Sequence, residues 1–319
     1  RNASMQGKRV TIFGGSGFIG RAISRELTQA GAWVTIGCTD VEAAKAMKTM
    51  GQPGQVTVVK ADVIDAAAVA RAVVGADYVI NLVGLLAPSG RHSFEKVHAT
   101  APGTIAAAAR DAGVAGLAQL SAIGADAASK SAYARTKAAG EAAVHAAFPA
   151  AVILRPSVVF GPDDGFFNRF AALAQLAPAL PLIGGARTRF QPVYVVDVAR
   201  ATVAALGDPA AAGQTYELGG PEVVSLRQVM TYVMEQTQRP RALVPLPFWA
   251  AKLQARFLEL LPKPPLTRDQ VTLLESDNLV AEDARTLADL GVTATSFHSV
   301  VPGYLRRHRP GGMYNPRRA

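Results

Sequence analysis

Three glycines near the start of the chain have the spacing of a phosphate-binding turn. The apolar run at 9–13 leads directly into the pattern Gly14-x-x-Gly17-x-x-Gly20. A tight turn needs a residue that accepts positive φ, and a close approach of a pyrophosphate needs a residue without Cβ. The helix that follows offers free N–H groups to the anion. We predict a dinucleotide site here, against the alternative of a strand-to-helix turn without a ligand. Its residues are Gly14, Gly15, Ser16, Gly17, Phe18, Ile19 and Gly20.

A second group of residues pairs a phenol with an ammonium. Tyr133 and Lys137 are four residues apart, which places them on one helix face. An ammonium near a phenol stabilises the phenolate and lowers its pKa toward that of an acid–base catalyst. Lys137 can also hydrogen-bond a ribose, and Ser121 can orient a carbonyl substrate or the phenol. The alternative is an ordinary helix face, because this spacing is common.

Other candidates follow predicted strands. Asp62, followed by Val63, stands where a carboxylate can accept a hydrogen bond from an adenine amino group or cap the next helix. Leu82, Val83 and Gly84 follow another strand, and the glycine lets the backbone approach a ribose or nicotinamide. The histidines are scattered and there is no cysteine pair, so no metal site is predicted.

The end of the second predicted strand bears on the choice of nucleotide. An NAD site has a carboxylate there, and an NADP site has an arginine nearby. This chain has Cys38 and Thr39 at that position, which we assign to the cofactor site. Asp40 comes later, in a Thr39-x-x-Glu42 spacing typical of a capping box. The missing carboxylate favours NADPH, with NADH as the alternative.

A parallel sheet is needed to bring these residues together. Apolar runs of strand length alternate with longer amphipathic segments over the first half of the chain. Strands are predicted at 9–13, 33–37, 56–60, 77–82, 116–120 and 151–155, and helices at 18–30, 41–49, 65–74, 95–112 and 131–147. This order indicates an α/β fold with a doubly wound, Rossmann-type sheet, in which ligands bind beyond the carboxyl ends of the strands.

The alternation ends after about residue 160, where prolines become frequent. We predict a dinucleotide-binding domain over 1–160, to which 191–220 returns through a strand at 214–219. Residues 161–190 and 221–319 are predicted to form a smaller, mostly helical lobe.

Composition excludes several classes of protein. Half of the 319 residues are hydrophobic, which indicates a globular core rather than disorder. The single cysteine, Cys38, excludes an internal disulfide. No uninterrupted apolar run is long enough to span a bilayer. The start at Arg1 suits a removed presequence or vector-derived residues.

Two features near the end of the chain favour contact with another surface. Residues 247–261 are predicted to form an amphipathic helix, suited to a membrane interface, to a partner subunit or to the core of its own lobe. Its apolar face consists of Phe248, Trp249, Leu253, Phe257, Leu260 and Leu261. More than half of the net charge of +9 comes from Arg306, Arg307, Arg309, Arg317 and Arg318. Such a tail suits an anionic membrane or an acidic protein, or is simply solvated. Without interleaved aromatic residues, nucleic acid is not expected.

Together these motifs resemble extended or atypical short-chain dehydrogenases/reductases. More narrowly, they resemble the family of nucleotide-binding accessory subunits of respiratory complex I. The matching segments, within 8–240, are VTIFGGSGFIG, SAIGAD, SAYARTK, ILRPSVVFGPDDGFFNRFA and RFQPVYVVDVARA. The resemblance implies tightly bound NADPH, with Pro156, Ser157 and Val158 in the cofactor site and Arg155 shaping the pocket mouth.

The resemblance also implies a location and a role. The chain would stabilise the junction of the peripheral and membrane arms, near the quinone-binding site, without turnover of its own. Its partners would be other complex I subunits, and a membrane surface or lipid through 247–261 and the basic tail. It would lie on the matrix side of the mitochondrial inner membrane, or on the cytoplasmic face of a bacterial inner membrane. The alternative is a free-standing NAD(P)H-dependent reductase, dehydrogenase or epimerase that uses Tyr133, Lys137 and Ser121.

Overall fold

A computed structural model describes residues 5–261 and 264–312. The chain forms two compact units, which are described separately. Unit 1 comprises Arg1–Pro156, Val195–Leu218 and Ala281–Thr293, and unit 2 comprises Ser157–Tyr194, Gly219–Val280 and Ala294–Ala319.

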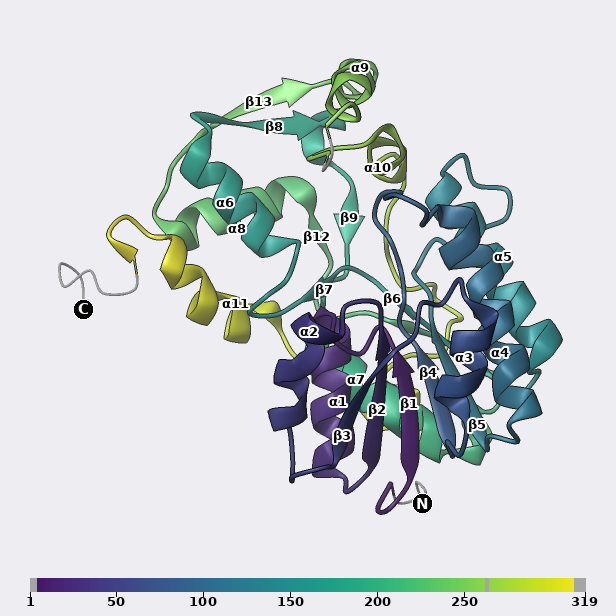
Figure 1. Ribbon diagram of the computed structural model, residues 1–319. Helices are drawn as coiled ribbons and strands as arrows, with labels where there is room; N and C mark the ends of the chain where they lie inside the picture. Colours follow the sequence, from purple (N-terminus) through teal and green to yellow (C-terminus); the bar gives the residue numbers. More distant parts are fainter. Residues whose placement is uncertain (1–4, 262–263, 313–319) are drawn as a thin grey trace. The chain divides into compact units, whose positions relative to one another are not determined.

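Unit 1 is built on a seven-stranded sheet of order β11-β6-β5-β4-β1-β2-β3, in which every pairing is parallel (Figure 1). The strands are β1 (Arg9–Phe13), β2 (Trp33–Cys38), β3 (Val56–Lys60), β4 (Tyr78–Asn81), β5 (Gly116–Leu120), β6 (Val152–Pro156) and β11 (Thr215–Leu218). The strand order reverses between β1 and β4, and ligands of such sheets bind at this switch point, beyond the carboxyl ends of the strands. The predicted doubly wound fold and the returning strand near 214–219 are confirmed.

The helices of unit 1 cover both faces of this sheet. They are α1 (Phe18–Gln29), α2 (Val41–Ala44), η1 (Lys45–Thr49), α3 (Ala66–Val73), the π-helix η2 (Glu95–Thr100), α4 (Ala101–Asp111), α5 (Ala132–Ala147), α7 (Val195–Gly207), η4 (Pro209–Ala211) and η5 (Ala288–Leu290). α1 and α7 pack on one face, and α3, α4 and α5 on the other (Figure 1). The helix predicted at 95–112 opens with a π-helical segment, a feature that propensity patterns do not reveal.

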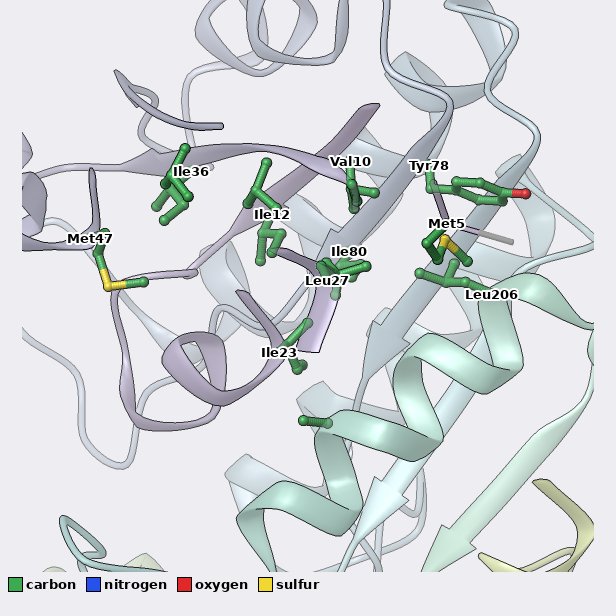
Figure 2. Close-up of a cluster of buried hydrophobic side chains, with 14 of the residues drawn as sticks. Met5, Val10, Ile12, Ile23, Leu27, Ile36, Met47, Tyr78, Ile80 and Leu206 are labelled. Atoms are coloured by element: carbon green, nitrogen blue, oxygen red, sulfur yellow. The ribbon is translucent and has the colours of Figure 1, made fainter. Parts of the chain in front are cut away.

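Each face of the sheet buries its own apolar core. Figure 2 shows the core between the strands and α1, where Ile12 and Ile36 face Ile23 and Leu27. The β-branched residues of the strands alternate between this core and the one under α3–α5, which contains Phe13 and Val79. Because both faces are covered, the strand sequences are almost continuously apolar, as expected for a parallel sheet.

The segment 281–293 belongs to unit 1, although the sequence places it in the smaller lobe. The Glu217 N–H in β11 donates to the Arg285 carbonyl oxygen (2.8 Å), and the Ala281 N–H donates to the Glu217 carboxylate (2.9 Å). Leu287 and Leu290 are buried. These contacts beside an edge strand leave no periodic pattern in the sequence.

Unit 2 combines short strands with helices. Its strands are β7 (Val159–Phe160), β8 (Ala179–Ile183), β9 (Arg189–Phe190), β10 (Val193–Tyr194), β12 (Val224–Ser225) and β13 (Ala242–Leu246). Its helices are α6 (Phe167–Leu176), η3 (Gly184–Ala186), α8 (Leu226–Thr237), α9 (Phe248–Leu258), α10 (Arg268–Leu273), α11 (Phe297–Leu305) and η6 (Arg306–His308). Its main core joins α6, α8 and α11 around Phe160, Phe167 and Phe297. Within the described ranges, no helix is long and apolar enough to cross a membrane.

Candidate dinucleotide site

The glycine turn between β1 and α1 forms a cradle in which Gly14, Gly15 and Gly17 bring no side chain. Gly14 has a φ of +80°, and its N–H donates to the Gly37 carbonyl oxygen at the end of β2 (3.2 Å). A Cβ on Gly20 would lie 2.5 Å from the Gly14 carbonyl oxygen and from Gly15, so no side chain fits there. Gly17 is the N-cap residue of α1 and brings no side chain to its first N–H groups. A helix start of this kind suits an anion.

The residues after β4 lie beside this turn. A Cβ on Gly14 would be 3.2 Å from the Val83 nitrogen and 3.3 Å from the Leu82 carbonyl carbon. Asn81 fixes the start of the segment: its amide donates to Gln119 Oε1 (2.8 Å), and its Oδ1 accepts from the Val83 N–H (3.1 Å). The structure therefore brings together two of the predicted segments, 14–20 and 82–84.

Gly84, Lys137 and Ser121 meet at the ends of β4 and β5. A Cβ on Gly84 would be 3.3 Å from Lys137 Nζ, and this Nζ lies 3.5 Å from the Leu120 carbonyl oxygen. The Ser121 hydroxyl is buried and has no hydrogen-bond partner within the described residues. Leaving such a group unpaired costs roughly 1–3 kcal/mol, which a hydrogen bond to a ligand would offset. The glycine cradle and this hydroxyl together fit a dinucleotide.

Tyr133 and Lys137 share a face of α5, with Lys137 Nζ 5.8 Å from the Tyr133 ring centroid. Burial raises the pKa of Tyr133 to about 12. Burial also lowers the pKa of Lys137 to about 8, although the charge of Glu141 opposes this shift. The predicted lowering of the phenol pKa by the ammonium is wrong for this arrangement, because burial outweighs the charge at this distance. The phenol therefore stays protonated at neutral pH.

His98 is a member of this site that the sequence analysis missed. Its Nε2 accepts from the Leu85 N–H (2.8 Å), and its Nδ1 lies 3.3 Å from Thr136 Oγ1. The Thr136 hydroxyl donates to the Ala132 carbonyl oxygen (2.8 Å), which assigns the proton of the imidazole to Nδ1. Burial, together with the nearby Lys137 charge, lowers the pKa of His98 to about 3. His98 thus ties the loop after Gly84 to α5, and no spacing in the sequence signals it.

Asp62, after β3, does not cap a helix. Asp65 caps α3 instead, with two hydrogen bonds to its first turn, so the capping alternative for Asp62 is wrong. The Asp62 carboxylate accepts from Arg91 Nη2 (2.7 Å), from the Ile64 N–H (3.2 Å) and from His92 Nε2 (3.1 Å). Burial opposes ionisation of this carboxyl, but these hydrogen bonds outweigh it and lower the pKa of Asp62. The sequence analysis did not anticipate this ionic cluster.

The end of β2 has the small, uncharged surface that the sequence indicates. The Cys38 thiol donates to the Asp40 carbonyl oxygen (3.4 Å), and burial, then the Asp40 charge, raises its pKa. Asp40 is itself the N-cap of α2 and accepts from the Ala43 N–H (2.9 Å). The capping box was predicted with Thr39 as the N-cap residue. The observed N-cap residue is Asp40, one position later.

The remaining predicted residues divide between the units. Val63 and Pro156 are buried in unit 1. Ser157 and Val158 belong to unit 2, where the Ser157 hydroxyl donates to Asn278 Oδ1 (2.6 Å).

Arg155, predicted to shape a pocket mouth, is engaged inside unit 1. It makes two hydrogen bonds to Glu141 (2.9 and 2.6 Å) and one to Glu217 (3.5 Å). These contacts tie β6 to α5 and β11, so this guanidinium has a structural role.

A hollow of about 810 Å³ lies at the other end of the sheet, where β2 and β3 begin. Its lining includes Trp33, Gln55 and Arg25 but none of the predicted site residues. Ligands of doubly wound sheets bind at the carboxyl ends, so we keep the site at the glycine turn.

Residues 10–219 match the NAD dependent epimerase/dehydratase family. The chain belongs to this family. The match includes the glycine turn, Asp62, Ser121 and the Tyr133–Lys137 pair, and the description of the family agrees with a nicotinamide dinucleotide as the ligand of the epimerase/dehydratase fold.

Two relatives extend the similarity over nearly the whole chain. Both are named NADH dehydrogenase (ubiquinone) 1 alpha subcomplex subunit 9, mitochondrial. The Mus musculus protein is 35% identical over 96% of this chain and 82% of its own length. The Arabidopsis thaliana protein is 34% identical over 97% of this chain and 80% of its own length.

Among solved structures, the fold resembles the Thermus thermophilus UDP-glucose 4-epimerase in complex with NAD. The TM-score is 0.69, with 23% identity over 93% of this chain and 99% of the other. At this identity the likeness shows the fold alone.

Proposed function

We propose that this epimerase/dehydratase-family chain is an accessory subunit of respiratory complex I, NADH:ubiquinone oxidoreductase. The observation that carries the proposal is the extent of similarity to the two subunit 9 relatives, 96% and 97% of the chain. A shared nucleotide-binding domain alone would account for 10–219 only. The proposed place is the junction of the peripheral and membrane arms, on the matrix side of the mitochondrial inner membrane or the cytoplasmic face of a bacterial one.

The proposed ligand is NADPH, with NADH as the alternative. The N–H groups at the start of α1 would hold the pyrophosphate, and Lys137 would hydrogen-bond the nicotinamide ribose. Ser121 would gain the partner that its buried hydroxyl lacks within the described residues. A bound dinucleotide supplies hydride chemistry at its nicotinamide, while the residues of this chain hold it and shield it from water.

The proposed role is structural, with no turnover of its own. A general acid–base catalyst works best with a pKa near the operating pH. Tyr133, with a pKa raised to about 12 by burial, is far from that range. Tight binding without turnover instead stabilises the folded chain, because the ligand binds the native state only.

α9 offers an apolar stripe that its own unit leaves uncovered. Trp249, Leu253 and Phe257, spaced by four residues, are 72%, 51% and 64% exposed. Phe248 instead packs inward, against Gly184. The alternative of a helix fully covered by its own lobe therefore does not hold for these three residues.

Basic residues border this stripe, which favours an anionic lipid surface as its occupant. Lys252 pairs with Glu275 (2.5 Å), whereas Arg256 is exposed. Aromatic and leucine side chains flanked by cations are typical of helices that lie in a membrane interface. We propose that α9 contacts lipid at the membrane surface of the complex.

The basic tail is a separate feature of unit 2, since Figure 1 shows α9 and α11 at opposite ends of this unit. Arg307 donates to the Pro162 carbonyl oxygen (2.8 Å), and Arg309 donates to the Gln236 carbonyl oxygen (2.8 Å). These two arginines fasten the chain to its own unit, and Arg306 is exposed. Arg317 and Arg318 lie outside the described residues.

Affinity purification of the tagged full chain from detergent-solubilised membranes of its source tests the proposal. We expect complex I subunits and NADH:ubiquinone oxidoreductase activity in the eluate. A chain that elutes alone from these membranes would contradict the proposal.

Vesicle binding tests the lipid contact. Changing Trp249, Leu253 and Phe257 to Ser should abolish binding to vesicles of phosphatidylcholine and phosphatidylglycerol. The matched control changes three exposed apolar residues elsewhere, Val74, Leu86 and Leu176, to Ser. Equal vesicle binding by the two triple variants would contradict the assignment of lipid to α9.

A second candidate function is a free-standing NAD(P)H-dependent reductase, dehydrogenase or epimerase. The observations that favour it are the Ser121 hydroxyl, which is buried and unpaired among the residues that the structure describes, and the Tyr133–Lys137 pair on one face of α5. A purified chain that turns over a carbonyl substrate, and loses this activity in Tyr133→Phe, would support this candidate instead.

A further inference from the structure

The loop between β4 and η2 brings a cation to the adenosine end of the proposed site. Gly90 and Arg91 are the central residues of a tight turn closed by Ser89 and His92, whose backbone groups exchange two hydrogen bonds of 3.0 Å. Gly90 has the positive φ (+56°) that a two-residue turn favours at this position. The turn therefore fixes the backbone from which Arg91 extends.

The carboxylate of Asp62 anchors this arginine without saturating it. Arg91 Nη2 donates to Asp62 Oδ2 (2.7 Å), and within the described residues its Nε and Nη1 have no acceptor. The Arg91 side chain is 70% exposed, whereas that of Asp62 is 12% exposed. A guanidinium has five N–H donors in a planar fork, so several remain available for an anion.

The carboxylate that anchors this guanidinium follows a residue that contacts the end of β2. The Ala61 N–H donates to the Cys38 carbonyl oxygen (2.9 Å), and a Cβ on Gly37 would lie 3.3 Å from the Ala61 Cβ. Asp62 is the next residue in the chain. In a Rossmann site the end of β2 faces the adenosine ribose, whose 2′ position carries the phosphate of NADPH.

Several other charged groups lie in this region. Lys45 pairs with Glu42 (2.6 Å), and the Asp40 carboxylate caps α2. Lys48 is exposed in η1, beyond α2. Lys60, the register partner of Cys38, is also exposed, and Arg91 differs from it in being anchored by the Asp62 carboxylate.

We propose that Arg91 binds the 2′-phosphate of NADPH and sets the preference for NADPH over NADH. NADP sites have an arginine near the end of β2, and this chain has none there. Arg91, from the β4–η2 loop, would take its place. A guanidinium makes short, charge-assisted and often bidentate hydrogen bonds to phosphate. The inference rests on the proposed nucleotide binding and adds to it the residue that recognises the 2′-phosphate.

Calorimetric titration of the nucleotide-free full chain tests this. Each variant is titrated with NADPH and NADH, and also with 2′,5′-ADP and ADP, which carry the adenosine end alone. Arg91→Ala should lower the ratio of NADPH to NADH affinity roughly 10- to 100-fold, as expected for hydrogen bonds to a charged group. The ratio for 2′,5′-ADP over ADP should fall equally, and Arg91→Lys should retain part of the discrimination.

Lys48→Ala removes one positive charge from the same region and is the matched control, with an unchanged ratio expected. An unchanged ratio in Arg91→Ala, or an equal fall in Lys48→Ala, overturns the inference and leaves the proposed nucleotide binding intact. Stronger binding of NADH than of NADPH by the wild-type chain also overturns it. Failure of the wild-type chain to bind any of the four nucleotides overturns both.

Discussion

The two ends of the proposed nucleotide site differ in the form of their titratable groups that the fold favours, which is charged at one end and uncharged at the other. At the adenosine end, burial opposes ionisation of the Asp62 carboxyl, but hydrogen bonds from the Ile64 N–H, His92 and the exposed Arg91 outweigh it and lower the pKa. At the nicotinamide end, burial moves the pKa of His98 to about 3, of Tyr133 to about 12 and of Lys137 to about 8. All three of these shifts favour the uncharged form.

This difference separates recognition from catalysis within one site. The Arg91 guanidinium can bind the additional phosphate of NADPH, because it is charged whether or not the ligand is present. His98 and Tyr133, with pKa values of about 3 and about 12, are poorly placed to exchange protons at pH 7, whereas the pKa of Lys137 stays close to neutrality. Under the proposed function, the adenosine end would select the nucleotide, and at the nicotinamide end the Tyr133 phenol would stay protonated.

The largest expected effect comes from the glycine turn, which serves both ends. Gly17→Val should lower NADPH affinity at least roughly 100-fold, because a branched side chain would occupy the place of the pyrophosphate. A Cβ there is 3.3 Å from the Gly14 carbonyl oxygen, so the turn itself can adjust. Nucleotide extracted from the purified chain is measured by mass spectrometry.

The matched control is Gly165→Val, because a Cβ on Gly165 meets nothing within 4 Å. It should retain its nucleotide. Undiminished nucleotide in Gly17→Val would remove the glycine turn from the site.

Lys137→Met tests the nicotinamide end. The change removes a charged hydrogen bond to the ribose, which contributes roughly 1.5–3 kcal/mol, so affinity should fall about 10- to 100-fold. NADPH and NADH should be affected equally, in contrast to Arg91→Ala. Titration with both nucleotides measures this, and a selective loss of NADPH would contradict the division of the site into two ends.

His98→Gln tests burial at the nicotinamide end through pH. The folded pKa of about 3 lies below the unfolded value near 6.5, so the unfolded state binds more protons between these values. Stability is therefore lost as pH falls through this window, by about 2 kcal/mol from this group between pH 7 and pH 5. Glutamine keeps an acceptor for the Leu85 N–H and has no such dependence.

Urea denaturation of the wild-type chain and His98→Gln at pH 7 and pH 5 measures the difference. The wild-type chain should lose more free energy of unfolding than the variant over this interval. Parallel losses would show that His98 is not held neutral by burial.

The smallest effect is expected from Tyr133→Phe. Removal of one hydroxyl should leave incorporation into complex I and the rate of NADH:ubiquinone oxidoreduction near the wild-type values. Native gel electrophoresis and the rate in isolated membranes check this. Reduced incorporation in Tyr133→Phe would show that the phenol has a structural role that the present account omits.

The sequence was sufficient for the sheet and for the residues at its carboxyl edge. The glycine spacing and the β-branched runs carry local signals, so β1, α1 and the strand ends could be placed from residue types alone. Gly14 and Val83 meet because parallel strands end at one edge, which follows from the alternation of strands and helices.

The remaining features depend on contacts between distant residues. Asp62 was placed at a strand end, but its partner Arg91 is 29 residues away in a loop without a pattern. The pKa of Tyr133 was predicted from its neighbour Lys137, whereas burial, a property of the whole fold, decides it. His98 lies in a π-helical segment, whose register a helical pattern does not give.

The nucleotide content of the intact complex tests the central claim most directly. Complex I is purified from the source membranes, and both this chain and NADPH are quantified by mass spectrometry before and after NADH:ubiquinone turnover. The account predicts one chain and one NADPH per complex, with the NADPH still reduced and bound after turnover. A complex without this chain, or NADPH that is consumed during turnover, would contradict it.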